Sequence, residues 1–229
     1  MGIQERKDRE REQRKTNIID CAMKVFLEKG IVNSSMEEIA ECAELSKATL
    51  YLYFKNKEEI ILYVMNVVLS TFLGYLETRM SKVDSAQDKI RMIGEAYLDF
   101  YGECHGQYLL LSSQESIAGM DFGNLDSYHE YLSHNSKFWD IICAPIYTAI
   151  NEGSFRKDAN AVEIAITIWA SSKGLMQLMN GVVATINCES YKNLADKSKF
   201  QEQLGTLNYM TMLRNLIDAI IISFQDKSE

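Results

Sequence analysis

Lysine, serine, threonine and tyrosine side chains are concentrated between residues 45 and 57, a segment that contains no Asp or Glu. The ten residues before it, Ser35 to Glu44, carry four glutamates. Ammonium and hydroxyl groups donate hydrogen bonds to phosphate oxygens, whereas a carboxylate beside them would repel a phosphate. The segment 45–57 therefore has the chemistry of a nucleic-acid contact, and we expect its lysines to reach phosphates without displacing a carboxylate.

The net charge of the whole chain, −8, argues against a polyanionic partner unless the charge is unevenly distributed. Residues 1–63 contain 11 Lys and Arg against 12 Asp and Glu, whereas residues 64–229 contain 13 against 20. Charges more than about 10 Å apart are largely screened by salt. One basic surface within the first 63 residues can therefore bind DNA although the protein as a whole is acidic.

Three residues are placed to cap the start of a helix, namely Ser35, Ser46 and Asn56. The first and the third are followed three residues later by a glutamate, as in a capping box. This spacing predicts two short helices, the second over residues 47–53, and then a long helix that ends near residue 80. A short helix, a tight turn and a second short helix form a helix-turn-helix, in which the first turn of the second helix reaches the base edges.

The rest of the chain also repeats its apolar residues every three or four positions, as amphipathic helices do. Proline occurs once, at Pro145, where we expect a kink in a helix rather than its end. The predicted fold class is therefore all-α. The helices predicted beyond residue 80 cover 85–104, 107–118, 125–152, 157–186 and 202–225, with a polar loop over 187–199.

Composition also predicts the compartment. Residues 60–76 are uncharged, but this stretch is shorter than the roughly 20 apolar residues of a membrane span, so we expect a buried core helix and no membrane partner. The N-terminal segment lacks the apolar core of a secretory signal. Five cysteines without a Cys-x-x-Cys pair are typical of buried thiols in a reducing cytoplasm. These features predict a cytoplasmic protein.

A longer pattern of residue types runs through the two short helices and into the long one. It consists of Ser35-Met36, Ile39-Ala40, Ala43, Ser46-Lys47, Thr49-Leu50-Tyr51, Tyr53-Phe54 and Lys57-Glu58-Glu59. This pattern resembles the DNA-binding domain of TetR-family transcriptional regulators, over about residues 14–65. Two positions depart from it, because Glu44 stands where a turn glycine is usual and Ala48 where the recognition helix usually has glycine.

The resemblance implies an all-α homodimer whose two headpieces bind a palindromic operator. It divides the chain into a helix-turn-helix domain, residues 1–63, and an effector-binding and dimerisation domain, residues 64–229. It also implies DNA contacts that are made mostly to phosphates, while the Ala48 methyl group can meet a thymine methyl group. The predicted DNA-binding residues are Ser35, Ser46, Lys47, Ala48, Thr49, Tyr51, Tyr53 and Lys57. For Tyr51 and Tyr53 the alternative is ring packing in a small core.

The last two predicted helices, 157–186 and 202–225, each carry a wide apolar stripe. In the family these helices of two subunits form a four-helix bundle, which places the homodimer contact there. The stripes alone fit the core of a monomer equally well. They consist of Ile164, Ala165, Ile168, Trp169, Ser172, Leu175, Met176 and Met179, and of Leu213, Leu216, Ile217, Ile220, Ile221 and Phe224.

Large amphipathic side chains in the second domain are candidates for an apolar effector pocket with a few polar groups. The candidate ligand-binding residues are Tyr97, Phe100, Tyr101, His105, Tyr108, Trp139, Tyr147, Trp169 and Met176. Ordinary core packing is the alternative for each of them. His129 and His134 are five residues apart and do not share a helix face, so no metal site and no cofactor are predicted.

Together these features predict a ligand-responsive transcriptional regulator, a repressor that a small apolar or amphipathic effector releases from its operator. No catalytic triad, metal-ligand spacing or nucleotide-binding loop supports an enzyme. A helical adaptor, or a small-molecule-binding protein without sequence-specific DNA binding, is the alternative. The charged segment from Glu5 to Lys15 is either an arm that lies along a groove or a solvated extension of the first helix.

Overall fold

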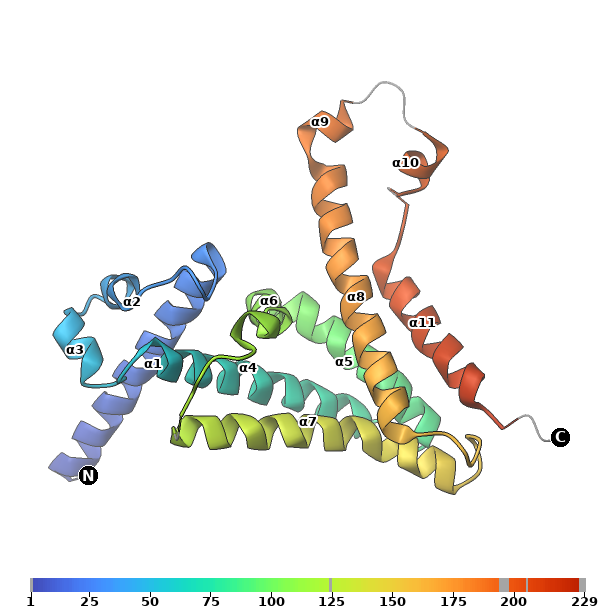
Figure 1. Cartoon of the computed structure of the whole chain (residues 1–229), viewed down its shortest axis with the longest axis horizontal. Helices are drawn as coiled ribbons and strands as arrows, with labels where there is room; N and C mark the ends of the chain where they lie inside the picture. The colour runs from blue at the N-terminus through green and yellow to red at the C-terminus, as the bar shows by residue number, and fades with distance from the viewer. Residues whose placement is uncertain (1, 124, 194–197, 205, 227–229) are drawn as a thin grey trace. The chain divides into compact units, whose positions relative to one another are not determined.

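The computed structural model describes residues 2–123, 125–193, 198–204 and 206–226, and the secondary structure of this part is helical (Figure 1). The elements are α1 (Ile3–Lys29), α2 (Met36–Cys42), α3 (Lys47–Tyr51), α4 (Lys57–Met80), α5 (Ala86–Glu103), α6 (His105–Ser112), the 3₁₀ helix η1 (Gln114–Ile117), α7 (Asp126–Asn151), α8 (Ala161–Asn187), α9 (Glu189–Lys192), α10 (Lys199–Leu204) and α11 (Tyr209–Phe224). The predicted all-α class is confirmed.

Two compact units are formed by packing. One consists of residues 1–74 and 100–138, and the other of residues 75–99 and 139–229. The helices α4, α5 and α7 each contribute residues to both units. This division follows contacts, whereas the boundary at residue 63 divides the chain by function, so that boundary remains a prediction.

The N-terminal part of the first unit is a small domain of α1, α2 and α3. Ile18, Ala22 and Phe26 recur at helical spacing on α1 and are buried. Leu50 of α3 is 0% exposed, and Phe54, four residues later, is 1% exposed. Burying a side chain of this size stabilises the fold by about 1.5–3 kcal/mol. The core therefore fixes α3 through its apolar side and leaves its polar side at the surface.

The predicted caps of the short helices are confirmed. The backbone N–H of Glu38 donates to Ser35 Oγ at 3.3 Å, and the backbone N–H of Ser35 donates to the Glu38 carboxylate at 2.9 Å. The backbone N–H of Thr49 donates to Ser46 Oγ at 3.1 Å at the start of α3. These reciprocal bonds satisfy N–H groups that have no partner inside a helix.

The turn between α2 and α3 contains a residue in the left-handed region. Glu44 has φ of +56°, at the position where the family pattern has glycine. A non-glycine residue in this conformation costs about 1–2 kcal/mol, because Cβ crowds the following carbonyl oxygen. The turn keeps its geometry because the backbone N–H of Leu45 donates to the Ala40 carbonyl at 2.9 Å.

Replacing Glu44 by glycine is expected to raise the free energy of unfolding by about 0.5–1 kcal/mol, because relief of the strained backbone exceeds the added freedom of the unfolded chain. The matched control is Glu41→Gly, since Glu41 is an exposed glutamate inside α2. The same replacement there should lower the free energy of unfolding by about 1 kcal/mol. Urea titration followed by circular dichroism compares the two variants. A loss of stability in Glu44→Gly would contradict the backbone strain at Glu44.

Several predicted boundaries are wrong by one turn or more. The helix predicted over 107–118 ends at Ser112 and continues as η1. The helix predicted from residue 157 begins at Ala161, because Asn160 Oδ1 accepts from the N–H groups of Val162 and Glu163. The helix predicted over 202–225 is divided into α10 and α11. The polar loop 187–199 contains α9, while residues 194–197 of that loop lie outside the described residues.

The apolar stretch at 60–76 lies within α4, as predicted. Among the described residues α4 is the one helix long and apolar enough to span a membrane, and 61% of its most apolar window is buried in the protein. Asn66, a polar residue in this stretch, is buried, and its Nδ2 donates to the Ser127 carbonyl of α7 at 2.9 Å. This burial is that of a core helix.

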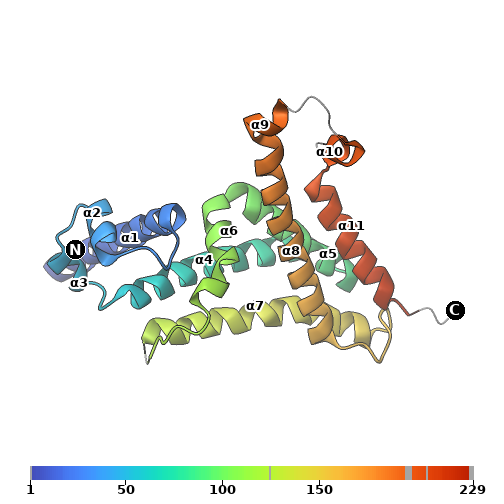
Figure 2. The same cartoon turned by 45° about the horizontal axis from the view of Figure 1, so that its top comes forward.

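The second unit contains α8 and α11, which lie side by side in both views (Figures 1 and 2). The N–H of Arg156, before α8, donates to the Phe224 carbonyl at the end of α11 at 3.0 Å. Helix α5 packs on α11 through Gly94, where an added Cβ would lie 2.2 Å from Ile217 Cδ1. Glycine therefore permits the close approach of these two helices.

The cysteines only partly follow the prediction of buried thiols. Cys21 and Cys143 are buried and Cys104 is half-buried, whereas Cys42 and Cys188 are exposed. Burial raises the pKa of the Cys21 thiol to about 11, so this side chain is a protonated thiol at neutral pH. No disulfide occurs within the described part of the chain.

Candidate nucleic-acid interface

The predicted DNA-binding residues of α3 lie on the surface of the three-helix domain. Ser46, Lys47 and Ala48 are exposed, Thr49 is half-buried, and Tyr51 is 45% exposed. Their shared exposure follows from the burial of Leu50, which turns the opposite side of this five-residue helix toward solvent. Ring packing of Tyr51 in the core is therefore excluded.

The side chains of Ser46 and Thr49 are hydrogen-bonded to each other at the start of α3. Their hydroxyl oxygens lie 2.8 Å apart, within hydrogen-bond distance. Ser46 thus serves as the N-cap of the helix and as the partner of Thr49. Ser35 has the corresponding capping role at α2 and is half-buried.

Lys47 has a carboxylate partner, which corrects one expectation from the sequence. The Lys47 ammonium group donates to the Glu37 carboxylate of α2, ten residues earlier in the chain. This hydrogen bond raises the pKa of Lys47 and lowers that of Glu37. A phosphate must therefore compete with Glu37 for Lys47, although the segment 45–57 itself contains no carboxylate. The sequence did not reveal this pair, because the turn between α2 and α3 brings the two residues together.

Lys57, at the start of α4, directs its ammonium group toward backbone carbonyls. Its Nζ donates to the carbonyls of Ile31, Val32 and Ser34 at 3.1, 3.0 and 2.9 Å. These carbonyls belong to the turn that connects α1 to α2. An ammonium group has three N–H donors, so a phosphate contact by this group would replace at least one of these bonds.

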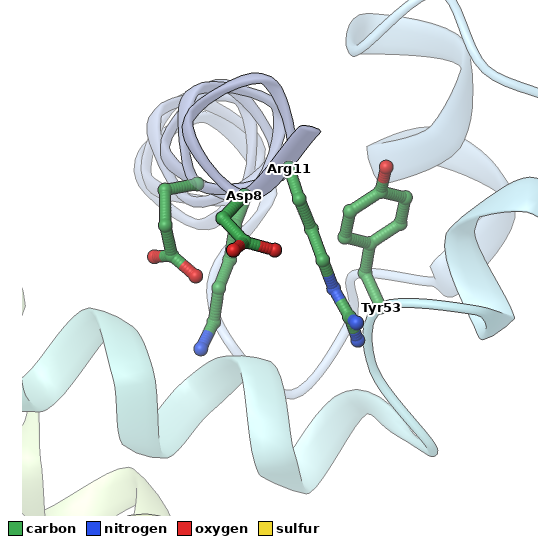
Figure 3. Close-up of a pocket in the computed structure, with 5 residues that line it drawn as sticks. Asp8, Arg11 and Tyr53 are labelled. Carbon is green, nitrogen blue, oxygen red and sulfur yellow. The ribbon is translucent and has the colours of Figure 1, made fainter. Parts of the chain in front are cut away.

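Tyr53 lies just beyond α3 and is half-buried. The predicted helix 47–53 ends at Tyr51, because the N–H groups of Leu52 and Tyr53 donate three residues back and tighten the last turn. Tyr53 lines a hollow of about 280 Å³ together with side chains of α1. In Figure 3 Arg11 and Tyr53 lie next to each other, with Asp8 on the other side of Arg11.

This arrangement matches a known family. Residues 18–64 match the family model of the bacterial regulatory proteins of the tetR family. The predicted resemblance to the TetR-family DNA-binding domain is therefore confirmed over residues 18–64. Over 76 residues it is 33% identical to the fatty acid metabolism regulator protein of Bacillus subtilis, in an alignment that covers 33% of this chain and 39% of that protein. Alignments with three curated relatives cover 39%, 46% and 49% of those proteins, so the chain spans about two fifths to one half of their length.

Solved structures of TetR-family proteins share the fold of nearly the whole chain. The regulator FadR of Bacillus subtilis in complex with stearoyl-CoA has a TM-score of 0.61 at 17% identity and covers 90% of this chain and 97% of its own. AibR in complex with isovaleryl coenzyme A and operator DNA has a TM-score of 0.59 at 20% identity and covers 89% and 98%. At these identities the likeness establishes the fold.

The candidate ligand-binding residues fall into both packing units. In the first unit the rings of His105 and Tyr108 lie 4.9 Å from that of Tyr101, and Phe100 packs on Phe72 at 5.0 Å. In the second unit Tyr97 packs edge to face on Trp169 at 5.3 Å. Met176 is buried, Trp139 is half-buried, and Tyr147 is 51% exposed. Their role in ligand binding remains a prediction.

The predicted dimer stripes are largely buried within the second unit. Ile164, Ile168 and Met176 of α8 are buried, as are Ile217 and Ile221 of α11. Both helices also expose apolar side chains outside these stripes. The most exposed are Val162, Ile166, Leu178, Met210 and Ile222.

The sequence also raised the question of a metal site in the second domain. His134 Nδ1 lies 3.1 Å from Asn66 Oδ1, within hydrogen-bond distance. His129 is exposed. No group of three His, Cys, Asp or Glu side chains that could hold a metal ion occurs among the residues placed by the structure.

Proposed function

We propose that this chain is a ligand-responsive transcriptional regulator that binds a palindromic operator as a homodimer and is released from it by an acyl-coenzyme A. The observation that carries the proposal is α3, whose polar side is exposed next to the TetR-family turn. Lys47, Thr49 and Tyr51 on this side are suited to phosphate and base-edge contacts. Ser46, Ala48 and Tyr53 flank them and complete the proposed contact surface with Ser35 and Lys57.

The acyl-coenzyme A effector is inferred from relatives of the same fold. FadR is described in complex with stearoyl-CoA, and AibR in complex with isovaleryl coenzyme A and operator DNA. The apolar side chains of the second domain suit an acyl chain, whose transfer from water contributes about 0.8 kcal/mol per CH₂ group. This extends the expectation of a small amphipathic effector to a chemical class.

The homodimer is supported by the exposed apolar side chains of α8 and α11. Leu178 is 65% exposed and Ile222 is 55% exposed, and isolated subunits would leave both in water. Two subunits that pair through these helices would bury them. Sedimentation equilibrium should give the mass of a dimer, and the mass of a single chain at micromolar concentration would contradict this part of the proposal.

DNA binding is tested by letting the protein select duplexes from a random 30-base-pair library. We expect one palindromic consensus, and the absence of any enriched sequence would favour a helical adaptor. On the selected duplex, Lys47→Gln is expected to weaken binding about tenfold and to lower the slope of log affinity against log salt by about one unit per chain. Glu37→Gln should have the opposite effect and strengthen binding, because it removes the carboxylate that competes for Lys47.

The effector class is tested by adding stearoyl-CoA, isovaleryl-CoA or free coenzyme A to the complex with the selected duplex. An acyl-coenzyme A is expected to weaken DNA binding by about 5- to 150-fold, the usual range of coupling between two sites. Free coenzyme A is the control that separates the effect of the acyl chain on DNA binding from the effect of the nucleotide. If neither thioester changes the affinity for DNA, the effector belongs to another class, while the selected duplex still establishes the operator.

We infer that the chain acts through binding rather than catalysis. Its TetR-family relatives are regulators, and no enzymatic role is required of any residue in the proposed site. A bacterial regulator of this kind binds chromosomal DNA in the cytoplasm, so we also propose that the protein is cytoplasmic.

A further inference from the structure

The N-terminal segment of α1 extends the helix before the first residue of the core. Helix α1 begins at Ile3, whereas its first buried side chain is Ile18. The residues before Lys15 whose side chains are described are exposed. This segment therefore forms a helical extension of the first helix with exposed side chains. Its charges face solvent rather than the core of the domain.

Basic residues on this extension form a row that continues the buried side of α1. Lys7, Arg11, Arg14 and Ile18 follow one another at intervals of four, three and four residues, which places them on one side of an α-helix. No acidic residue interrupts this row. Arg6 lies outside this row, on another side of the helix, and pairs with Glu10 at 2.9 Å.

Arg11 stands at the point where this row meets the proposed DNA-binding surface. It lines the hollow beside Tyr53, and Figure 3 shows the two side chains next to each other. In the part of the chain that the structure describes, Arg11 makes no ion pair with a carboxylate. Lys15, in the same hollow, lies over the ring of Tyr63 with Nζ 3.8 Å from the centroid. Lys15 is therefore already held by an aromatic ring, whereas Arg11 is available to a ligand.

We propose that Arg11 and Tyr53 together bind a phosphate group of the operator, so that α1 adds a second contact with the DNA backbone to that of α3. A guanidinium group presents several N–H donors that match phosphate oxygens, and a phenol adds one more donor. This inference rests on the proposed DNA-binding function. Asp8 and Glu12 also line the hollow, and their charges oppose the contact.

The carboxylate of Asp8 accepts a hydrogen bond from another residue of the same helical extension. Its Oδ1 accepts a hydrogen bond from Gln4 Nε2 at 3.0 Å. Its negative charge nevertheless lies next to the proposed phosphate position. Removing that charge is therefore expected to act in the direction opposite to removing the charge of Arg11.

The test measures the affinity of Arg11→Gln for the duplex that the wild-type protein selects, by fluorescence anisotropy at several salt concentrations. We expect a three- to tenfold loss of affinity near 0.1 M salt and a loss of about one unit of the salt slope per chain. Arg6→Gln is the matched control, because it removes the same charge from the same helix at a position outside the row. Asp8→Asn should increase the affinity.

Arg11→Lys keeps the positive charge and should keep the wild-type salt slope. Equal slopes for Arg11→Gln, Arg6→Gln and the wild type would overturn the inference, as would an Arg11→Lys slope as low as that of Arg11→Gln. Failure of the wild-type protein to select any duplex would instead contradict the proposed function. Arg11 is exposed, so thermal melting of its variants should match the wild type and confirm that the affinity reports on the contact.

Discussion

Replacing Lys57 by methionine is expected to lower the free energy of unfolding by about 3 kcal/mol and to abolish binding to the selected operator. The substitution keeps an unbranched stem of similar length but removes the donor from three backbone carbonyls. A hydrogen bond to a charged group contributes about 1.5–3 kcal/mol, and part-buried carbonyls without a partner are costly. The α1–α2 turn would lose its connection to α4, and α3 would no longer be held in place.

Lys55→Met is the matched control for this prediction, because it removes an exposed lysine two residues earlier and changes the charge equally. Urea titration without DNA separates the two roles of Lys57. A Lys57→Met protein that unfolds like Lys55→Met but fails to bind DNA would show that Lys57 acts as a phosphate contact alone. Lys57→Arg should restore only part of the stability, since a planar guanidinium group cannot converge on three carbonyls as an ammonium group does.

Replacing Gly94 by alanine is expected to destabilise the second unit by about 1–2 kcal/mol. The added Cβ would lie 2.2 Å from Ile217 Cδ1, and Ile217 is buried, so the two helices must move apart or the isoleucine must leave its rotamer. The greater helix propensity of alanine offsets this cost by no more than about 1 kcal/mol. Thermal unfolding should show a lower midpoint for the variant.

Ile217→Val provides a direct check, because it removes the Cδ1 atom that the new methyl group would meet. On its own it should cost about 0.5–1.5 kcal/mol through the space it leaves. Combined with Gly94→Ala it should restore stability to near the wild-type value, since the alanine methyl group fills that space. A double variant whose loss equals the sum of the two single losses would contradict the close contact between α5 and α11.

The sequence predicted the headpiece well because its signals are local. Cap residues act on N–H groups three positions away, so Ser35, Ser46 and Asn56 mark helix starts without knowledge of the fold. Leu50 and Phe54 lie four residues apart, and their burial leaves the polar side of α3 exposed. The family pattern has glycine at the position of Glu44, and Glu44 adopts the left-handed conformation that favours glycine.

Contacts between distant residues were not predictable by the same reasoning. Glu37 reaches Lys47 across a turn, and Lys57 reaches carbonyls 23 to 26 residues away, so neither partner is visible in the spacing of the sequence. The prediction of one helix over 202–225 is wrong because the apolar periodicity continues across the break. Asn208, whose Oδ1 accepts from the N–H of Thr211 at 3.1 Å, is the residue in the sequence that marks the start of α11.

The helical extension of α1 has a consequence for the length of DNA that one subunit protects. Thirteen residues, 3–15, extend about 20 Å at 1.5 Å per residue, which corresponds to about six base pairs at 3.4 Å each. If Arg11 follows the phosphate backbone, a nuclease footprint should continue past the bases read by α3. Deleting residues 2–10 should leave Arg11 in place and shorten only the outer edge of that footprint.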